Sequence, residues 1–195
     1  MRKNLKISLI PHVFLSNLLN KLEEIEIDFS YTESYKHFID YFKNPDVIEE
    51  KHFYISTNFV YGWMPTILKY KSNKINDCIS LLNEVKSGEI LNKDQLTILK
   101  STINNSIIGV SKLLHFINPD NYAMWDSNIC NFLYGSKDIA NNIDRYLEYT
   151  SFIDKIVNSD EFIASFPKYQ EKFNDFTSGK IRVLENMMFQ VGKKA

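Results

Sequence analysis

Apolar residues recur every three or four positions along most of the chain, a spacing that predicts α-helices. The clearest stripe places Tyr35, Phe38, Ile39 and Phe42 on one helical face before Pro45. Similar stripes predict helices over 12–27, 31–43, 75–86, 93–104, 111–117, 127–133, 139–158, 167–177 and 180–190, and Pro65 suits the first turn of another through Leu68. Asn92 and Asp126 (or Ser127) fit the N-cap positions of two of them. The sequence therefore predicts an all-α protein.

Residues 52–63, HFYISTNFVYGW, depart from this spacing because they are rich in aromatic and β-branched side chains. Such a run is typical of a short strand or of a buried extended segment. Both alternatives stay open for this segment.

Composition excludes several classes of protein. The 195 residues are 44% hydrophobic and 24% charged, with only 6 Gly and 5 Pro, which is typical of a globular domain. The 2 Cys residues form no disulfide framework, and no zinc-binding spacing occurs, so we expect no metal or cofactor. Pro11 and His12 interrupt a weak signal-peptide pattern, and no apolar run approaches a membrane span. We expect a cytoplasmic monomer.

Charge is distributed unevenly, although the formal net charge is only −1. Residues 66–115 carry seven Lys against four acidic residues, whereas 23–53 carry nine acidic residues against three Lys. The lysine-rich segment is therefore the better candidate for contact with an anionic partner. Ordinary surface lysines would give the same modest excess.

The segment with the clearest chemistry is 107–132, IIGVSKLLHFINPDNYAMWDSNICNF. We expect Gly109 in a tight connection between two helices, Lys112 at the start of the second and Asp126 at the start of the next. A helix start stabilises negative charge, so a carboxylate there stays ionised and a lysine is biased toward its neutral, nucleophilic form.

These residues resemble the helix-hairpin-helix DNA glycosylases, in particular the compact 8-oxoguanine-glycosylase-like branch with relatives in anti-phage defence. The resemblance rests on the order Gly-Val-x-Lys, the spacing S-K-x-x-H-F-x-x-P-x-x-x-x-x-W-D-S and the stretch YAMWDSNICNFL. The stretch IRVLENMMF is similar to the closing helix of that group. Gly109-Val110-Ser111-Lys112 is one residue shorter than the usual Gly-x-Gly-x-Lys, and alignment on the glycine would place Leu113 at the lysine position.

The resemblance implies one compact domain of two helical lobes, with lobe A from 1–63 and 136–195 and lobe B from 64–135. Base excision would occur in the cleft of this fold. Asp126 matches the aspartate that stabilises the oxocarbenium-like sugar, and Lys112 matches the lysine that forms a Schiff base in bifunctional members. Gly109 matches the hairpin glycine whose backbone approaches a DNA phosphate.

Further candidates follow from position. Ser111 and Lys100 would contact DNA phosphates beside Gly109. Tyr61, Trp63, His12 and His115 are candidates for a base pocket, since aromatic rings stack on extruded bases. Each candidate also has a structural interpretation: Asp126 as an N-cap, Lys112 as a surface lysine, Tyr61 and Trp63 as a hydrophobic hinge, His115 as a packed side chain and His12 as an exposed helix start. Arg182 and Glu185 are expected to form a surface pair.

Two functions remain open from the sequence. The first is a DNA N-glycosylase that flips a modified or damaged base out of double-stranded DNA and leaves an abasic site. The second is a non-catalytic DNA- or nucleotide-binding module on the same fold, which the shortened hairpin favours.

Overall fold

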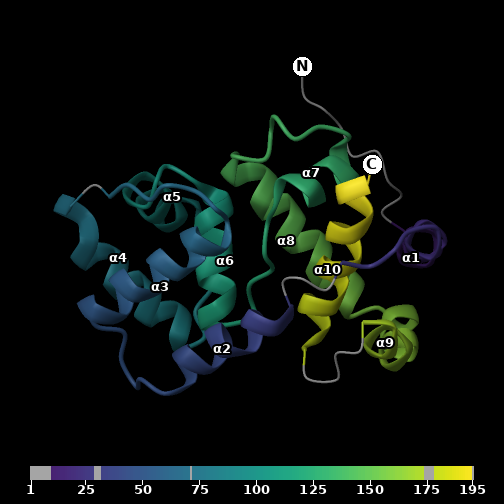
Figure 1. The fold of residues 1–195 in the computed structure, drawn as a ribbon, viewed down its shortest axis with the longest axis horizontal. Coiled ribbons are helices and arrows are strands. Elements are labelled where there is room, and N and C mark those ends of the chain that lie inside the picture. Colours follow the sequence, from purple (N-terminus) through teal and green to yellow (C-terminus); the bar gives the residue numbers. More distant parts are fainter. Residues whose placement is uncertain (1–9, 29–31, 71, 174–177, 195) are drawn as a thin grey trace. The chain divides into compact units, whose positions relative to one another are not determined.

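The computed structural model describes residues 10–28, 32–70, 72–173 and 178–194, and the regular elements among these residues are all helices (Figure 1). The predicted all-α class is confirmed. The helices are α1 (Pro11–Glu23), α2 (Thr32–Lys43), α3 (Glu50–Trp63), α4 (Ile75–Lys86), α5 (Lys93–Thr102), α6 (Ile107–Ile117), α7 (Ser127–Tyr134), α8 (Ile143–Val157), α9 (Asp160–Lys172) and α10 (Lys180–Lys194), with one 3₁₀ turn, η1 (Ser72–Lys74). Position 31 and positions 174–177, which two predicted helices included, lie outside the described residues.

The chain forms two compact units. Unit 1 comprises Met1–Asp28, Trp125–Ala140 and Arg145–Ala195, and unit 2 comprises Phe29–Met124 and Asn141–Asp144. These boundaries differ from the expected lobes, because α2 and α3 pack on α6 in unit 2 while α7 packs along α10 in unit 1. Within the described ranges, no helix is long and apolar enough to cross a membrane.

Unit 2 is organised around α6, which contacts α2, α3, α4 and α5. Its sequence, IIGVSKLLHFI, is apolar on almost every face, and a helix of that kind is normally buried. All but two of its side chains, those of Ile108 and Lys112, are buried. The helices around it therefore have one shared apolar surface to cover.

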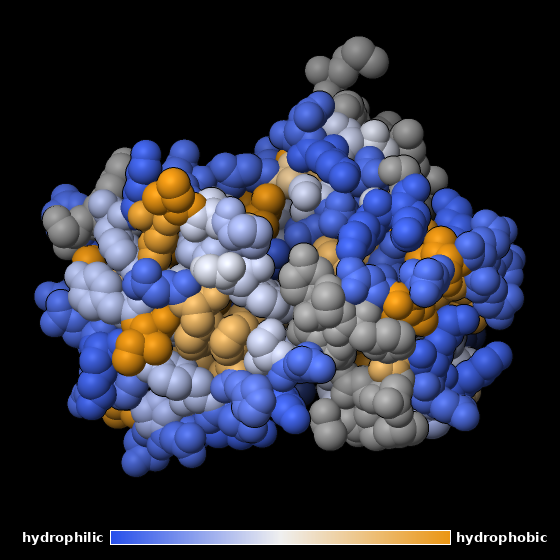
Figure 2. All heavy atoms as spheres, viewed as in Figure 1, coloured by the Kyte–Doolittle hydropathy of each residue, from blue (hydrophilic) through white to orange (hydrophobic). Residues whose placement is uncertain are grey.

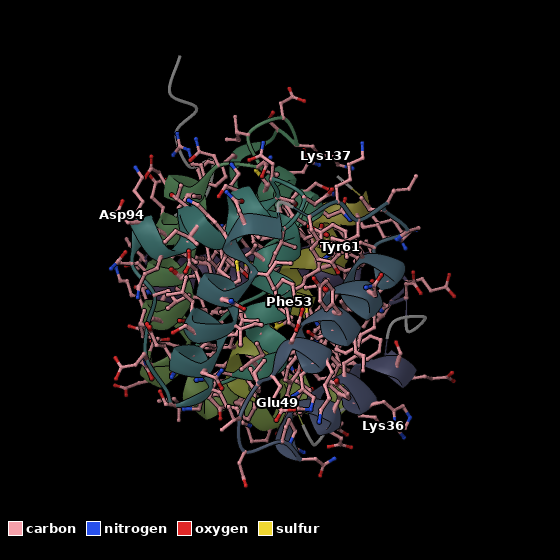
Figure 3. All side chains as sticks on the ribbon, turned by 90° about the vertical axis from the view of Figure 1, so that its left-hand side faces the viewer. Lys36, Glu49, Phe53, Tyr61, Asp94 and Lys137 are labelled. Carbon is pink, nitrogen blue, oxygen red and sulfur yellow. The ribbon has the colours of Figure 1, made fainter. Side chains whose placement is uncertain are left out.

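Residues 52–63 form most of α3, so both extended alternatives for this segment are wrong. The buried positions Phe53, Ser56, Thr57, Val60 and Tyr61 follow helical spacing, but two of them are polar, which hid the pattern. The polar positions are compatible with burial because the Ser56 and Thr57 hydroxyls donate to the Phe53 carbonyl at 3.1 and 2.7 Å. Figure 3 shows Phe53 and Tyr61 well inside the outline of the molecule, with Glu49 toward its edge.

The start of α6 corrects the expected hairpin. The helix begins at Ile107 and its N-cap is Ser106, whose hydroxyl accepts a hydrogen bond from the Gly109 amide at 3.2 Å. The tight connection lies at residues 103–106, where Asn104 and Asn105 adopt positive φ angles of 58° and 51°. Asparagine tolerates this conformation better than most residues. Gly109 is therefore inside the first turn of α6, and not in the connection.

The observed bounds of α9, and the structure of residues 65–68, also differ from the helices predicted from the sequence. In each case a local signal was overlooked. α9 begins at Asp160 and contains Pro167, which the predicted helix used as its start. Ser159 is its N-cap, and two acidic residues follow in the first turn, which is a favourable helix start. Residues 65–68 are not helical, because the chain closes a turn with the Thr66 amide donating to the Tyr61 carbonyl.

Unit 1 is built on a close contact between α7 and α10. A Cβ atom added to Gly192 would lie 2.0 Å from the Asn128 carbonyl oxygen and 3.2 Å from the Phe132 Cβ. Only glycine permits the two backbones to approach this closely. The Phe14 ring of α1 lies 6.2 Å from the Phe132 ring of α7 and 4.8 Å from the Phe152 ring of α8.

We expect Gly192→Ala to lower the free energy of unfolding by about 1–3 kcal/mol, because the added methyl group must displace backbone atoms. The measurement is urea denaturation. Gly62→Ala is the matched control: Gly62 is also helical, its added Cβ would meet nothing within 4 Å, and alanine has the higher helix propensity. Equal stability of the two variants would contradict the close contact.

Candidate functional site

Asp126 occupies the N-cap position of α7, as predicted. Its Oδ1 atom accepts a hydrogen bond from the Asn128 backbone amide at 2.6 Å, and the side chain is half-buried. α7 ends at Gly135, which adopts the left-handed conformation expected of a C-terminal glycine. The carboxylate thus lies at the positive end of a helix, where negative charge is stabilised.

The residue before Asp126 is held firmly within unit 1. Trp125 is fully buried, and its Nε1–H donates to the Ala140 carbonyl at 2.6 Å. Its ring lies 4.9 Å from the ring of Tyr149 on α8. The close approach of Gly192 to Asn128 restrains the other side of the same turn. Asp126 is therefore fixed by packing before it and after it.

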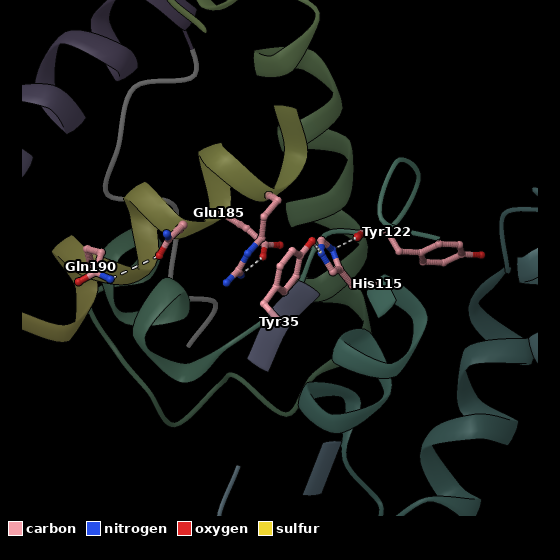
Figure 4. A network of polar contacts seen from close by, with 7 residues as sticks. Tyr35, His115, Tyr122, Glu185 and Gln190 are labelled. Carbon is pink, nitrogen blue, oxygen red and sulfur yellow. Dashed lines mark hydrogen bonds and ion pairs between the residues drawn. The ribbon is translucent and has the colours of Figure 1, made fainter. Parts of the chain in front are cut away.

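Arg182 and Glu185 on α10 are not a surface pair, and this expectation is wrong. The Glu185 side chain is 1% exposed and that of Arg182 is 11% exposed, with Nη1 and Oε1 separated by 2.5 Å. Figure 4 shows the Glu185 contact as a dashed line. Val183, Leu184, Met187 and Met188 around it are apolar, and this was the available signal that Glu185 falls on the buried face.

Tyr149 belongs to the same part of unit 1 and is completely buried. Burial raises the pKa of its phenol well above the usual range, and the carboxylates of Glu185 and Asp126 act in the same direction, while Arg182 opposes them. Two carboxylates and one guanidinium therefore influence a single buried phenol. Sequence analysis did not single out Tyr149, because nothing local distinguishes it from other apolar positions of α8.

Lys112 lies in the second turn of α6, and not at its start. The partial positive charge of a helix N-terminus fades within the first turn, so it does not bias this amine toward its neutral form. The Lys112 Nζ atom instead lies 5.6 Å from the centroid of the Trp63 ring. An aromatic face attracts an ammonium group.

Gly109 and Ser111 are buried in unit 2. A Cβ at Gly109 would lie 2.3 Å from the Tyr61 hydroxyl oxygen, so the ring of Tyr61 explains the glycine without a phosphate. The Ser111 hydroxyl donates to the Ile108 carbonyl at 2.9 Å. The Gly109 amide donates to the Ser106 hydroxyl, so both groups that were predicted to contact phosphate form hydrogen bonds within the protein.

His115 and Tyr61 are buried, with internal hydrogen bonds, and do not line an open pocket. His115 Nδ1 lies 2.6 Å from the Tyr122 carbonyl and its Nε2 lies 2.8 Å from the Tyr35 hydroxyl (Figure 4). A carbonyl only accepts, so Nδ1 carries the proton and a neutral ring accepts from Tyr35 at Nε2. The Tyr61 hydroxyl donates to the Ile103 carbonyl at 3.3 Å.

The remaining predicted residues are accessible to different degrees. His12 is exposed in the first turn of α1, in unit 1. Trp63 is half-buried at the end of α3. Lys100 is half-buried in α5, and its Nζ donates to the Asn141 carbonyl at 2.8 Å. Hydrophilic side chains cover most of the face in Figure 2, with apolar side chains in small groups.

The structure therefore groups the candidates by unit. Unit 1 holds Asp126 with the unpredicted residues Tyr149, Arg182 and Glu185, and unit 2 brings Lys112 to Trp63 and Gly109 to Tyr61. Over the described part of the chain, no group of three or more His, Cys, Asp or Glu side chains could hold a metal ion.

Neither family models nor curated proteins nor solved structures gave a match to this chain.

The burial of Tyr61 should be detectable as a loss of unfolding free energy at alkaline pH. Burial raises the pKa of Tyr61 to about 12, against about 10 for a free tyrosine. The folded protein thus holds this proton more tightly, so its contribution to stability is complete below pH 10 and is lost as pH rises toward 12. We expect Tyr61→Phe to flatten part of the alkaline decline in urea-unfolding free energy. An unchanged decline would show that this phenol is not protected by the fold.

Proposed function

We propose that the protein is a DNA N-glycosylase that removes a modified or damaged base from duplex DNA and leaves an abasic site. The observation that carries the proposal is the position of Asp126, a partly accessible carboxylate at a rigid helix start within the segment that resembles the glycosylase catalytic segment. The proposed substrates are a bulky modified base of phage DNA or an oxidised purine.

The chemistry requires a negative group that does not move. As the base leaves, positive charge develops on the deoxyribose, and a carboxylate fixed beforehand stabilises that charge without the cost of reorganisation. Asp126 meets this requirement because Trp125 and Asn128, on either side of it, are held by unit 1.

DNA binding in this proposal depends on unit 2. The lysine excess of residues 66–115 would supply phosphate contacts, and such contacts make affinity fall steeply with salt. The half-buried Trp63 ring is the base-stacking candidate that remains, since His115 and Tyr61 are engaged inside the protein. Extrusion of a base costs a few kcal/mol, and less for a damaged base.

Asp126→Asn should lower the single-turnover rate of base release at least about a hundredfold, because it removes the charge and keeps the shape. Duplexes that contain candidate modified bases are the substrates, and released base is measured by mass spectrometry. Asp160→Asn, at an exposed helix start of the same unit, is the control and should retain the parent rate.

Two results would contradict this proposal. Full activity of Asp126→Asn would place the active site elsewhere. Tight, salt-dependent duplex binding by the parent, with no base released from any duplex, would favour the non-catalytic binding module.

Lys112 should decide only whether strand cleavage follows base removal. A neutral amine at Lys112 can attack the sugar carbon and remain bound as an imine. We therefore expect borohydride to trap a protein–DNA adduct on the parent protein and not on Lys112→Gln. Base release by Lys112→Gln at the parent rate, with no adduct trapped on either protein, would show that the protein is monofunctional and that water attacks the sugar instead.

A further inference from the structure

Trp125, the residue before Asp126, is held in unit 1 through both its polar and its apolar atoms. The side chain is 0% exposed, and its Nε1–H donates to the Ala140 carbonyl at 2.6 Å. Its ring lies 4.9 Å from the ring of Tyr149 on α8 and packs edge-on, at 6.5 Å, against the ring of Tyr134 on α7. Two helices and one hydrogen bond therefore restrain the same side chain.

The acceptor of this hydrogen bond is itself fixed. Ala140 is buried, and its amide donates to the Lys137 carbonyl at 3.1 Å, which closes a turn. This turn follows the end of α7 at Gly135, whereas Trp125 lies before the start of α7. The Nε1–H bond thus joins the chain before α7 to the chain after it. A buried N–H group that loses its acceptor is costly, so the bond resists rotation of the ring.

The backbone conformation of Asp126 links the ring to the carboxylate. Asp126 is extended, with φ −147° and ψ 155°. Successive side chains of an extended backbone point to opposite sides, so a tryptophan ring that points into unit 1 directs the next side chain outward. The burial of the two residues agrees, because Trp125 is buried and Asp126 is half-buried. The hydrogen bond from the Asn128 amide then fixes the outward carboxylate against the start of α7.

We propose, on the basis of the glycosylase function above, that Trp125 is a positioning residue that determines which way the Asp126 carboxylate faces. Trp125 does not touch the substrate, because it is buried. Without the anchored ring, the peptide group between the two residues is free to rotate and the carboxylate turns with it. A displacement of about 1 Å in a reacting group can cost about a hundredfold in rate, so the effect falls on the chemical step and not on DNA binding.

The first test is Trp125→Phe, which keeps an aromatic ring and removes the N–H group. We expect the single-turnover rate at saturating duplex to fall at least about tenfold, with duplex affinity unchanged. Tyr134→Phe is the matched control. Tyr134 is also a buried ring of unit 1 with one polar hydrogen bond, from its hydroxyl to Glu148 at 3.1 Å. Its loss leaves the anchor of Trp125 in place, so this control should keep the parent rate.

A second control separates positioning from loss of stability. Leu18 on α1 is also fully buried in unit 1, and truncation of a buried leucine to alanine is strongly destabilising. We expect Leu18→Ala to be at least as sensitive to urea as Trp125→Phe and yet to keep the parent rate, at a temperature at which circular dichroism shows both variants folded. An equal loss of rate in the two variants would show that Trp125 has only a structural role.

Hydrogen exchange tests the proposal without an activity assay. The Asn128 amide donates to the Asp126 carboxylate at 2.6 Å, and the Phe162 amide donates to the Ser159 hydroxyl at the N-cap of α9, in the same unit. If Trp125 directs the carboxylate, Trp125→Phe should speed up exchange of the Asn128 amide, measured by NMR, and leave that of Phe162 unchanged. An Asn128 amide that exchanges as in the parent, or an equal change at both amides, would overturn the positioning role.

The outcomes separate the two proposals. A parent protein that releases no base from any duplex overturns the glycosylase function itself. An active parent whose folded Trp125→Phe variant keeps the full rate overturns only the positioning role. If that variant does not fold, Tyr149→Leu decides, because it keeps the indole and its hydrogen bond and removes the ring packed on it: a loss of rate supports the role, and the parent rate overturns it.

Discussion

The backbone contact between α10 and the first turn of α7 determines where the Asp126 carboxylate lies in unit 1. Gly192 leaves no room for a side chain against the Asn128 carbonyl, and the Asn128 amide donates to Asp126. A tight helix–helix contact of this kind fixes one helix relative to the other, because packed interiors are dense and resist small displacements. The helix cap at Asp126 and the anchored ring of Trp125 act on the same short stretch of chain.

The ion pair between Arg182 and Glu185 in unit 1 is buried, whereas other ion pairs of the protein are exposed to solvent. The ion pairs Lys43–Asp40, Lys51–Glu49 and Lys93–Asp144 are exposed, and such pairs contribute little to stability. Arg182 and Glu185 are withdrawn from solvent beside a buried phenol. Such groupings of perturbed, buried polar residues are more common at functional sites than in ordinary cores. This contrast makes unit 1 the centre of the proposed chemistry.

Unit 2 has a different physical character. Its central helix α6 is apolar on most faces, and the polar groups that it carries are satisfied internally: Ser111 by Ile108, and His115 by Tyr35 and Tyr122. Lys112 is the charged residue of α6 that is only half-buried, and its Nζ lies 5.6 Å from the centroid of the Trp63 ring. These features suit a rigid platform for binding better than a source of nucleophiles.

The sequence by itself determined the local features of this protein. The N-caps at Asn92 and Asp126 and the helix stop at Gly135 could be predicted because each depends on hydrogen bonds or backbone conformation within a few residues. The all-α class followed from apolar spacing for the same reason.

Only the tertiary structure decided what depends on distant neighbours. Residues 52–63 form a helix because polar side chains of α3 bond to their own backbone while its face packs on α6. Gly109 is required by the ring of Tyr61, 48 positions earlier in the chain, and not by a phosphate. Glu185 is buried because α10 turns that face inward. No local pattern contains these contacts, since each is formed by residues that meet only when the chain has folded.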